Sequence, residues 1–241
     1  MIGELPKLSP RLLAIAEMVP HCKLLGDVGT DHGKLPLYLI RTGRVERAIA
    51  TDISSNSLDK LRNVLVEDSA ADQIECIVSD GLLAFQQAVP DVVVIAGMGG
   101  KLIMTMFQRA PEIRDQVKRF ILQPNTNESE LRSYLHQQGL RIEDETCIWD
   151  AGHFYQILSV VKGVENYEKQ SHYLYGYLNL TRQNPTTLQL LDSEYARYRE
   201  IQRRLEEQGM TGEKPDRIKQ HLKWIEEAYQ HYETERNHTQ I

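Results

Sequence analysis

Short apolar segments alternate with helical patterns along the first two thirds of the chain, and this alternation constrains the fold more than any other feature. The segments predicted to be strands are 23–28, 47–52, 74–78, 91–96 and 119–123. The stretches between and after them that are predicted to be helices are 34–42, 55–67, 82–88, 100–109 and 127–138. Repeated strand–helix–strand units build a mostly parallel sheet, so the predicted fold class is α/β.

Residues 140–162 break this alternation, because they contain two apolar strand patterns with no helix between them. A mostly parallel sheet that ends in an antiparallel hairpin is the outline of a Rossmann-like class I methyltransferase domain more than of a dinucleotide dehydrogenase. That comparison is an analogy between folds and does not by itself assign an activity.

The last third of the chain has a different pattern. Leu188, Leu191, Tyr195, Tyr198, Ile201 and Leu205 recur every three or four residues, as do Ile218, Leu222, Ile225 and Tyr229. Gly209, Gly212 and Pro215 separate the two series, which predicts two antiparallel helices that begin at Pro185 and Pro215. We therefore predict a methyltransferase-like domain over 1–164 and a small, coiled-coil-like helical domain over 165–241. Apolar stripes of this kind usually only hold helices together.

Composition narrows the function classes. A chain of 241 residues that is 41% hydrophobic can bury a substantial core. Its net charge of −6 provides no general attraction for polyanions, so any nucleic-acid binding would use a local basic patch. Cys22, Cys76 and Cys147 form no CxxC pair, which predicts neither a disulfide framework nor a metal site.

Targeting signals are also missing from the sequence. It contains no run of 18 apolar residues, and the N-terminal stretch MIGELPKLSP lacks the apolar region of a signal peptide. The expectation is a cytoplasmic protein with no membrane partner. The oligomeric state stays open, and a monomer is compatible with the sequence.

The turn after the first predicted strand carries unusual chemistry. Its sequence GDVGTDHGKLP, residues 26–36, fails the GxGxxG dinucleotide fingerprint. It fits better an acidic-x-Gly-x-Gly-x-Gly pattern typical of methyltransferases, with Asp27 first, Gly29 next and Asp31 in place of the middle glycine. Such a turn brings backbone amides at a helix start close to a ligand.

Four later strand ends also carry residues that suit a ligand site. In open α/β sheets, ligands bind at the carboxyl ends of the strands. The candidate ligand-binding residues there are Asp52 and Ile53, then Asp80, Gly81 and Leu82, then Ala96, Gly97, Met98 and Gly99, and finally Gln123 and Asn125. Asp52 is placed to hold ribose hydroxyls and Asp80 an adenine amino group. Each of these two acids could instead cap the helix that follows it.

Three motifs together resemble a known family. DVGTDHGKLP, IAGMGG and ILQPN, in this order and followed by a two-helix tail, resemble the bacterial tRNA adenine-N1 methyltransferases that act on the adenine at position 22, the TrmK family. The opening KLSPRLLAIAEMVP and the SDGL segment fit the same family, whereas Asp52 departs from it because relatives commonly carry glutamate there. The specific match covers about residues 7–161.

The resemblance implies transfer of a methyl group from S-adenosyl-L-methionine to N1 of an adenine in tRNA. It implies that the cofactor contacts Asp27, Gly29, Asp31, His32 and the candidates at the ends of strands two to four, and that Arg11, Gln123 and Asn125 contact the substrate. Asp31 is the predicted catalytic residue, because a carboxylate could orient the N6 amino group, stabilise the charge that develops on the base and assist proton loss. Alternatively, Asp31 holds the loop as an Asx-turn, and His32 bonds nearby backbone.

Two other readings compete with a tRNA methyltransferase: a methyltransferase for a small molecule, and a non-catalytic module that presents the helical tail. The glycine-rich AGMGG, where enzymes that methylate exocyclic amines carry Asn or Asp followed by Pro-Pro, favours ring-nitrogen chemistry. Basic side chains that could meet phosphate are Lys7, Arg11, Lys34, Arg41 and Arg44 near the first helix and Arg197, Arg199, Arg203 and Arg204 in the tail. The tail is expected to contribute to tRNA binding and not to cofactor affinity.

Overall fold

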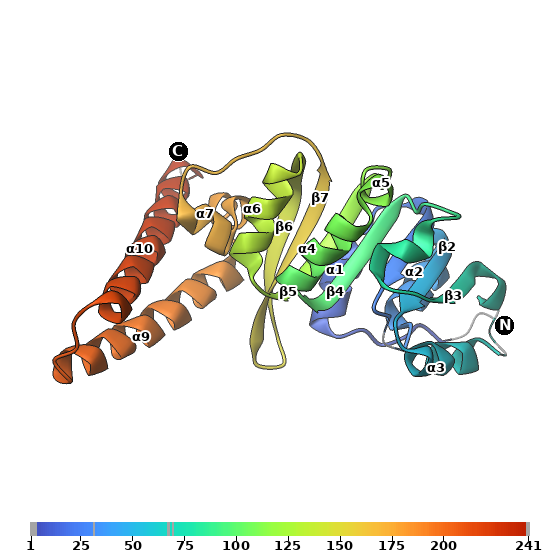
Figure 1. The fold of residues 1–241 in the computed structure, drawn as a ribbon, viewed down its shortest axis with the longest axis horizontal. Coiled ribbons are helices and arrows are strands. Elements are labelled where there is room, and N and C mark those ends of the chain that lie inside the picture. Colours follow the sequence, from blue (N-terminus) through green and yellow to red (C-terminus); the bar gives the residue numbers. More distant parts are fainter. Residues whose placement is uncertain (1–3, 31, 67, 69, 240–241) are drawn as a thin grey trace.

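A seven-stranded sheet in the order β3-β2-β1-β4-β5-β7-β6 forms the centre of the protein (Figure 1). The computed structural model describes residues 4–30, 32–66, 68 and 70–239, with the backbone alone for 236–239. The strands are β1 Cys22–Val28, β2 Val45–Asp52, β3 Ile74–Val78, β4 Val92–Gly99, β5 Arg119–Thr126, β6 Leu140–Asp150 and β7 His153–Lys162. Strands β1 to β5 are parallel, and β7 joins β5 and β6 antiparallel. The predicted α/β class with a terminal antiparallel hairpin is confirmed.

Helices cover both faces of this sheet. One apolar cluster contains side chains of α1 Pro10–Met18, α2 Lys34–Arg41 and α3 Ser55–Leu65, and a second contains those of α4 Gly100–Arg109, α5 Pro111–Arg114 and α6 Glu128–Gln137. Strand β4 begins with a run of four aliphatic residues, Val92–Ile95, which are buried because the strand lies between both layers. The predicted helix over 82–88 is wrong, because the segment after β3 is a short 3₁₀ helix, η2 Gly81–Phe85. Another 3₁₀ helix, η1 Ala71–Gln73, precedes β3.

The C-terminal part adds four helices beyond β7: α7 Gln170–Tyr175, α8 Tyr177–Thr181, α9 Pro185–Glu207 and α10 Glu213–Thr239. The long helices α9 and α10 lie antiparallel and project away from the sheet beside β6 (Figure 1). Leu191 of α9 and Leu222 and Ile225 of α10 are buried in an apolar cluster of their own, as the two stripes predicted. Pro185 starts α9 as expected, whereas α10 begins two residues before Pro215.

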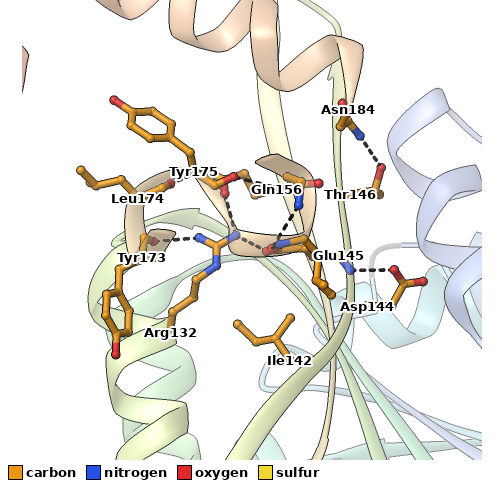
Figure 2. A network of polar contacts seen from close by, with 12 residues as sticks. Arg132, Ile142, Asp144, Glu145, Thr146, Gln156, Tyr173, Leu174, Tyr175 and Asn184 are labelled. Atoms are coloured by element: carbon orange, nitrogen blue, oxygen red, sulfur yellow. Dashed lines mark hydrogen bonds and ion pairs between the residues drawn. The ribbon is translucent and has the colours of Figure 1, made fainter. Parts of the chain in front are cut away.

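A buried polar joint connects the sheet to this tail (Figure 2). We use the name for Arg132 of α6, Glu145 of β6 and Gln156 of β7. The Arg132 guanidinium donates to Glu145 Oε2 and to Gln156 Oε1, both at 2.7 Å, and to the carbonyl oxygen of Tyr173 in α7 at 3.0 Å. The Glu145 Oε1 atom accepts the N–H of Leu178 at 2.8 Å, at the start of α8. Because these groups are buried, the joint holds α7 and α8 in one orientation against the sheet.

Candidate active site

A cleft of about 340 Å³ opens at the carboxyl edge of the sheet, beside β1 and β4. The strand order reverses between these two strands, which is where open α/β sheets bind ligands. The cleft is lined by Arg11, Leu12, Asp27, Val28, Gly29, Thr30, His32, Lys34, Leu35, Ala96 and Gly97. The structure thus brings six of the predicted site residues, from three separate segments, into one cavity: Arg11, Asp27, Gly29, His32, Ala96 and Gly97.

The turn after β1 is fixed to β2 by backbone hydrogen bonds. The N–H groups of Gly29 and Thr30 both donate to the carbonyl oxygen of Thr51 in β2, at 2.7 and 3.1 Å. Gly29 has φ +77°, a conformation that residues with a Cβ rarely adopt, so glycine is favoured at this position. His32 also lies in the left-handed region, and its Nε2 is 3.5 Å from Lys60 Nζ. The predicted catalytic residue Asp31 lies outside the described residues.

Asp27 is a buried acid at the floor of the cleft, only 7% exposed. The hydroxyl of Thr30 donates to its carboxylate. Burial raises the pKa of Asp27 to about 6, and the neighbouring charge of Asp52 acts in the same direction. A buried carboxylate with a second carboxylate nearby leaves the cleft suited to a ligand with a cationic group. Thr30 was not predicted as a site residue. Its only signal in the sequence is a hydroxyl side chain within the glycine-rich turn.

Asp52 ends β2 and keeps part of its carboxylate available. Its Oδ1 accepts the Ser54 N–H at 2.7 Å, whereas no hydrogen bond to a described residue is made by Oδ2. The alternative that Asp52 is the N-cap of α3 is wrong, because Ser54 is that residue. Ile53, next along the chain, is 75% exposed and presents an apolar surface at the same sheet edge.

The three candidates after β3, Asp80, Gly81 and Leu82, have different surroundings. Asp80 occupies the N-cap position of η2, as the capping alternative expected, but its carboxylate makes no cap hydrogen bond there and pairs with Arg109 at 2.6 Å. Gly81 adopts φ +60°. The Leu82 side chain lies in the core, so only its backbone can reach a ligand.

The AGMGG segment forms a β-bulge that is held by side chains of β5. The register between β4 and β5 shifts between Ala96 and Met98, which leaves the backbone of Gly97 outside the ladder. Gln123 Oε1 accepts the Gly97 N–H at 3.1 Å, and the Asn125 side chain donates to the Gly97 carbonyl at 2.8 Å. Gln123 is buried, and its amide nitrogen donates to Pro124 and Asn125. Gln123 therefore shapes the bulge rather than facing the cleft.

Arg11 of α1 is the cation that this bulge positions. Its Nη1 donates to Gln123 Oε1 at 2.7 Å, and its guanidinium lies 5.4 Å from the centre of the Tyr155 ring. The helix itself is anchored because the Arg11 N–H donates to Asp150 Oδ2 at 3.1 Å. Arg11 is thus held between β5 and the β6–β7 hairpin while it lines the cleft.

Most of the other expected cations have structural partners. Arg41 bonds Asp68 and the carbonyl of Glu4, and Arg44 donates to carbonyls at the end of α1. In the tail, Arg197, Arg203 and Arg204 pair with glutamates of their own helix, and Arg199 donates to Gln202. Lys34, which lines the cleft, remains a cation at the site.

A wider groove, of about 440 Å³, lies between α1, β6 and α8. Asp144 and Arg182, which line it, form an ion pair with each other, and Glu145 there belongs to the buried joint. Because the strand order reverses beside β1 and not at this groove, the cleft beside β1 is the better candidate. Among the described residues, no group of three His, Cys, Asp or Glu side chains could hold a metal ion, and no helix could cross a membrane.

Comparison with known proteins identifies the family. A family model described as a methyltransferase domain matches residues 8–158. The chain belongs to this family. This chain is 29% identical to the tRNA (adenine(22)-N(1))-methyltransferase of Bacillus subtilis (strain 168) over 157 residues, which are 65% of this chain and 66% of that protein. The sequence match therefore spans about two thirds of the relative's length.

Solved structures extend the match beyond the methyltransferase domain. Streptococcus pneumoniae Sp1610 in complex with S-adenosyl-L-methionine has a TM-score of 0.83 and 29% identity, over 92% of this chain and 99% of that one. The B. subtilis m1A22 tRNA methyltransferase TrmK has a TM-score of 0.83 and 25% identity, over 93% and 99%. The shared architecture therefore includes the helical tail.

Proposed function

We propose that this protein transfers a methyl group from S-adenosyl-L-methionine to N1 of an adenine in tRNA, at the position equivalent to 22. The observation that carries the proposal is the structural match to the B. subtilis m1A22 enzyme over 93% of the chain. Because that match includes α7 to α10 as well as the cleft, it favours a tRNA substrate over a small molecule.

The cleft residues fit S-adenosyl-L-methionine. Asp27 is a buried carboxylate without an ion-pair partner among the described residues, and it suits the ammonium group of the cofactor. The Oδ2 of Asp52, which makes no hydrogen bond to a described residue, suits ribose hydroxyls. The exposed Ile53 side chain and the Asp80–Gly81–Leu82 backbone suit an adenine ring. The positive φ of Gly29 and Gly97 lets the backbone approach the ligand closely.

The cofactor supplies an electrophilic methyl group on a sulfonium sulfur, and the protein's main task is positioning. Holding acceptor and donor in line can contribute about 7–11 kcal/mol. The adenine must leave its stack to expose N1, at a cost of a few kcal/mol. We assign the positioning of the base to Arg11 and to Asn125, with Gln123 acting through the Gly97 bulge that it holds.

Asp31 is the proposed catalytic residue. It lies in sequence between Thr30 and His32, which both line the cleft. Its carboxylate would accept a hydrogen bond from the N6 amino group, stabilise the positive charge that N1 alkylation creates and assist proton loss from that group. His32 of the same turn and Met98 and Gly99 at the end of β4 are assigned to the cofactor side of the site.

The test is transfer of tritiated methyl to unmodified tRNA, followed by mass spectrometry of the nucleosides. Wild-type protein should form N1-methyladenosine, and Asp31→Ala should lose about 10²–10³-fold in kcat while it still binds the cofactor. Asp72→Ala, at an exposed position in η1, is the matched control and should be as active as wild type. A folded wild type that binds the cofactor and leaves tRNA unmethylated would refute the proposal.

We also propose that residues 1–164 and 165–241 are two functional units, with tRNA binding shared between them. Supporting this, the tail has its own apolar cluster. A variant that ends at residue 164 would also strip α7 and α8 from the buried joint, so its loss of activity would have two causes. Surface substitutions on the tail are therefore the sharper test, as described below.

A further inference from the structure

The β6–β7 hairpin carries two aromatic side chains at its tip. Trp149 and Phe154 are directly opposite in the antiparallel register, and their ring centres are 4.5 Å apart. The turn between the strands is made by Ala151 and Gly152, both with positive φ, a conformation that matches the twist of a tight hairpin. The pair therefore lies on a well-defined support.

The tip of this hairpin lies at the same sheet edge as the cleft. Leu122 of β5 is opposite Leu158 of the antiparallel β7, so β7 begins where β5 ends. The hairpin projects beyond the neighbouring strand in Figure 1. Arg11 connects it to the cleft, because this one residue lines the cleft, bonds Asp150 through its N–H and lies over the Tyr155 ring.

The two faces of the tip do different things. Ile148 and Tyr155 face α1, where Ile148 packs against the core and Tyr155 meets Arg11. Trp149 and Phe154 point to the opposite face because side chains alternate along a strand. Trp149 there keeps 50% of its surface exposed. A cross-strand aromatic pair stabilises a hairpin by about 0.2–1 kcal/mol. This small gain in stability does not by itself explain a tryptophan at an exposed tip.

We propose that Trp149 and Phe154 form a stacking platform for an unpaired nucleobase of the substrate tRNA, next to the adenine that enters the cleft. The inference rests on the proposed function. Extracting one base from a stem exposes the faces of its neighbours, and exposed bases stack on aromatic side chains whatever their identity. The cations Arg11 and Lys34 at the adjoining cleft complement the phosphates on either side.

Fluorescence gives a direct test, because the chain contains only two tryptophans. In Trp224→Phe, which removes the tail tryptophan, all tryptophan emission comes from Trp149. Unmodified tRNA should quench this emission and protect it from acrylamide, whereas S-adenosyl-L-methionine alone should leave it unchanged. Unchanged emission at tRNA concentrations that saturate the protein, or the absence of tRNA binding, overturns the platform. Because the titration measures binding, it decides the question even if methyl transfer is not detected.

Kinetics gives the second test, in the full-length protein. Trp149→Leu should raise the KM for tRNA about tenfold, with kcat and the KM for the cofactor within twofold of wild type. Trp149→Phe keeps an aromatic face and should recover most of the loss. Trp224→Leu is the matched control and should leave all three constants unchanged. Equal loss in Trp149→Phe and Trp149→Leu, or an unchanged KM for tRNA in both, would contradict stacking.

Discussion

The cleft and the buried joint each contain a carboxylate that is almost fully removed from water, but the two are compensated differently. Glu145 in the joint accepts from Arg132 and from two backbone N–H groups, of Leu178 and Asn179. Asp27 in the cleft accepts from the Thr30 hydroxyl and has a second carboxylate nearby, which together with burial raises its pKa to about 6. A buried acid with full compensation holds the structure together, whereas one with partial compensation suits a ligand.

Breaking the joint should have the largest effect on stability. Glu145→Ala leaves the Arg132 guanidinium buried without its counter-charge, so the free energy of unfolding should fall by about 3–5 kcal/mol. Urea unfolding measures this loss. The double variant Arg132→Met/Glu145→Leu removes both charges and should recover most of it. A loss below about 1 kcal/mol in Glu145→Ala would mean that the joint does not hold the tail.

Asp27 should show the opposite behaviour, because its ionisation opposes folding. Its pKa of about 6 in the fold exceeds the ordinary value of 3.8, so stability is highest when the group is protonated and falls as pH rises from about 4 to 6. This fall amounts to about 3 kcal/mol. Unfolding measured across this range should show it in wild type and not in Asp27→Asn, which should be the more stable protein above pH 7.

The cofactor should reverse that preference. Calorimetric affinity of wild type for S-adenosyl-L-methionine should rise between pH 5 and 7 as Asp27 ionises, whereas Asp27→Asn should bind weakly at every pH. Equal affinity of the two proteins at pH 8 would contradict a contact between Asp27 and the cofactor's ammonium group.

Asp52→Asn tests the second cleft carboxylate with a smaller expected effect. Asparagine keeps the Oδ1 that accepts from Ser54, so the turn before α3 should persist. The loss of one charge-assisted hydrogen bond should weaken cofactor binding about tenfold. Asp59→Asn, which breaks the exposed pair with Arg62 on α3, is the matched control and should change the affinity less than twofold.

The smallest effect is expected from the paired arginines of α9. Arg203 bridges Glu200 and Glu207, so Arg203→Gln should leave the KM for tRNA within twofold. Lys219 and Lys223 lie four residues apart on α10, are exposed and have no ion-pair partner among the described residues. Replacing both by glutamine should raise that KM about threefold or more and make binding less salt-dependent. A larger rise in the KM for tRNA in Arg203→Gln than in the double lysine variant would assign phosphate binding to α9.

Local patterns were sufficient for several of the longer regular elements of the fold. Strands β1 and β3 and helix α4 match their predicted ranges within one residue, because a periodic run of apolar side chains reports which face is buried. The prediction failed at 82–88, where a short 3₁₀ segment with buried Leu82 and Phe85 serves the core without a full helix. The short helices α7 and α8 were missed because each has too few residues to show a period.

The sequence by itself determined that acids, glycines or side-chain amides follow the parallel strands, and parallel strands bring their carboxyl ends to one edge. Only the tertiary structure decided which of these polar groups already have a partner within the protein. Gln123 accepts hydrogen bonds from Arg11 and Gly97, which lie 112 and 26 residues away, and Asp80 pairs with Arg109. Such partners are chosen by packing between distant segments, so no local pattern reveals them, and they separate the residues that hold the cleft from those left to act in it.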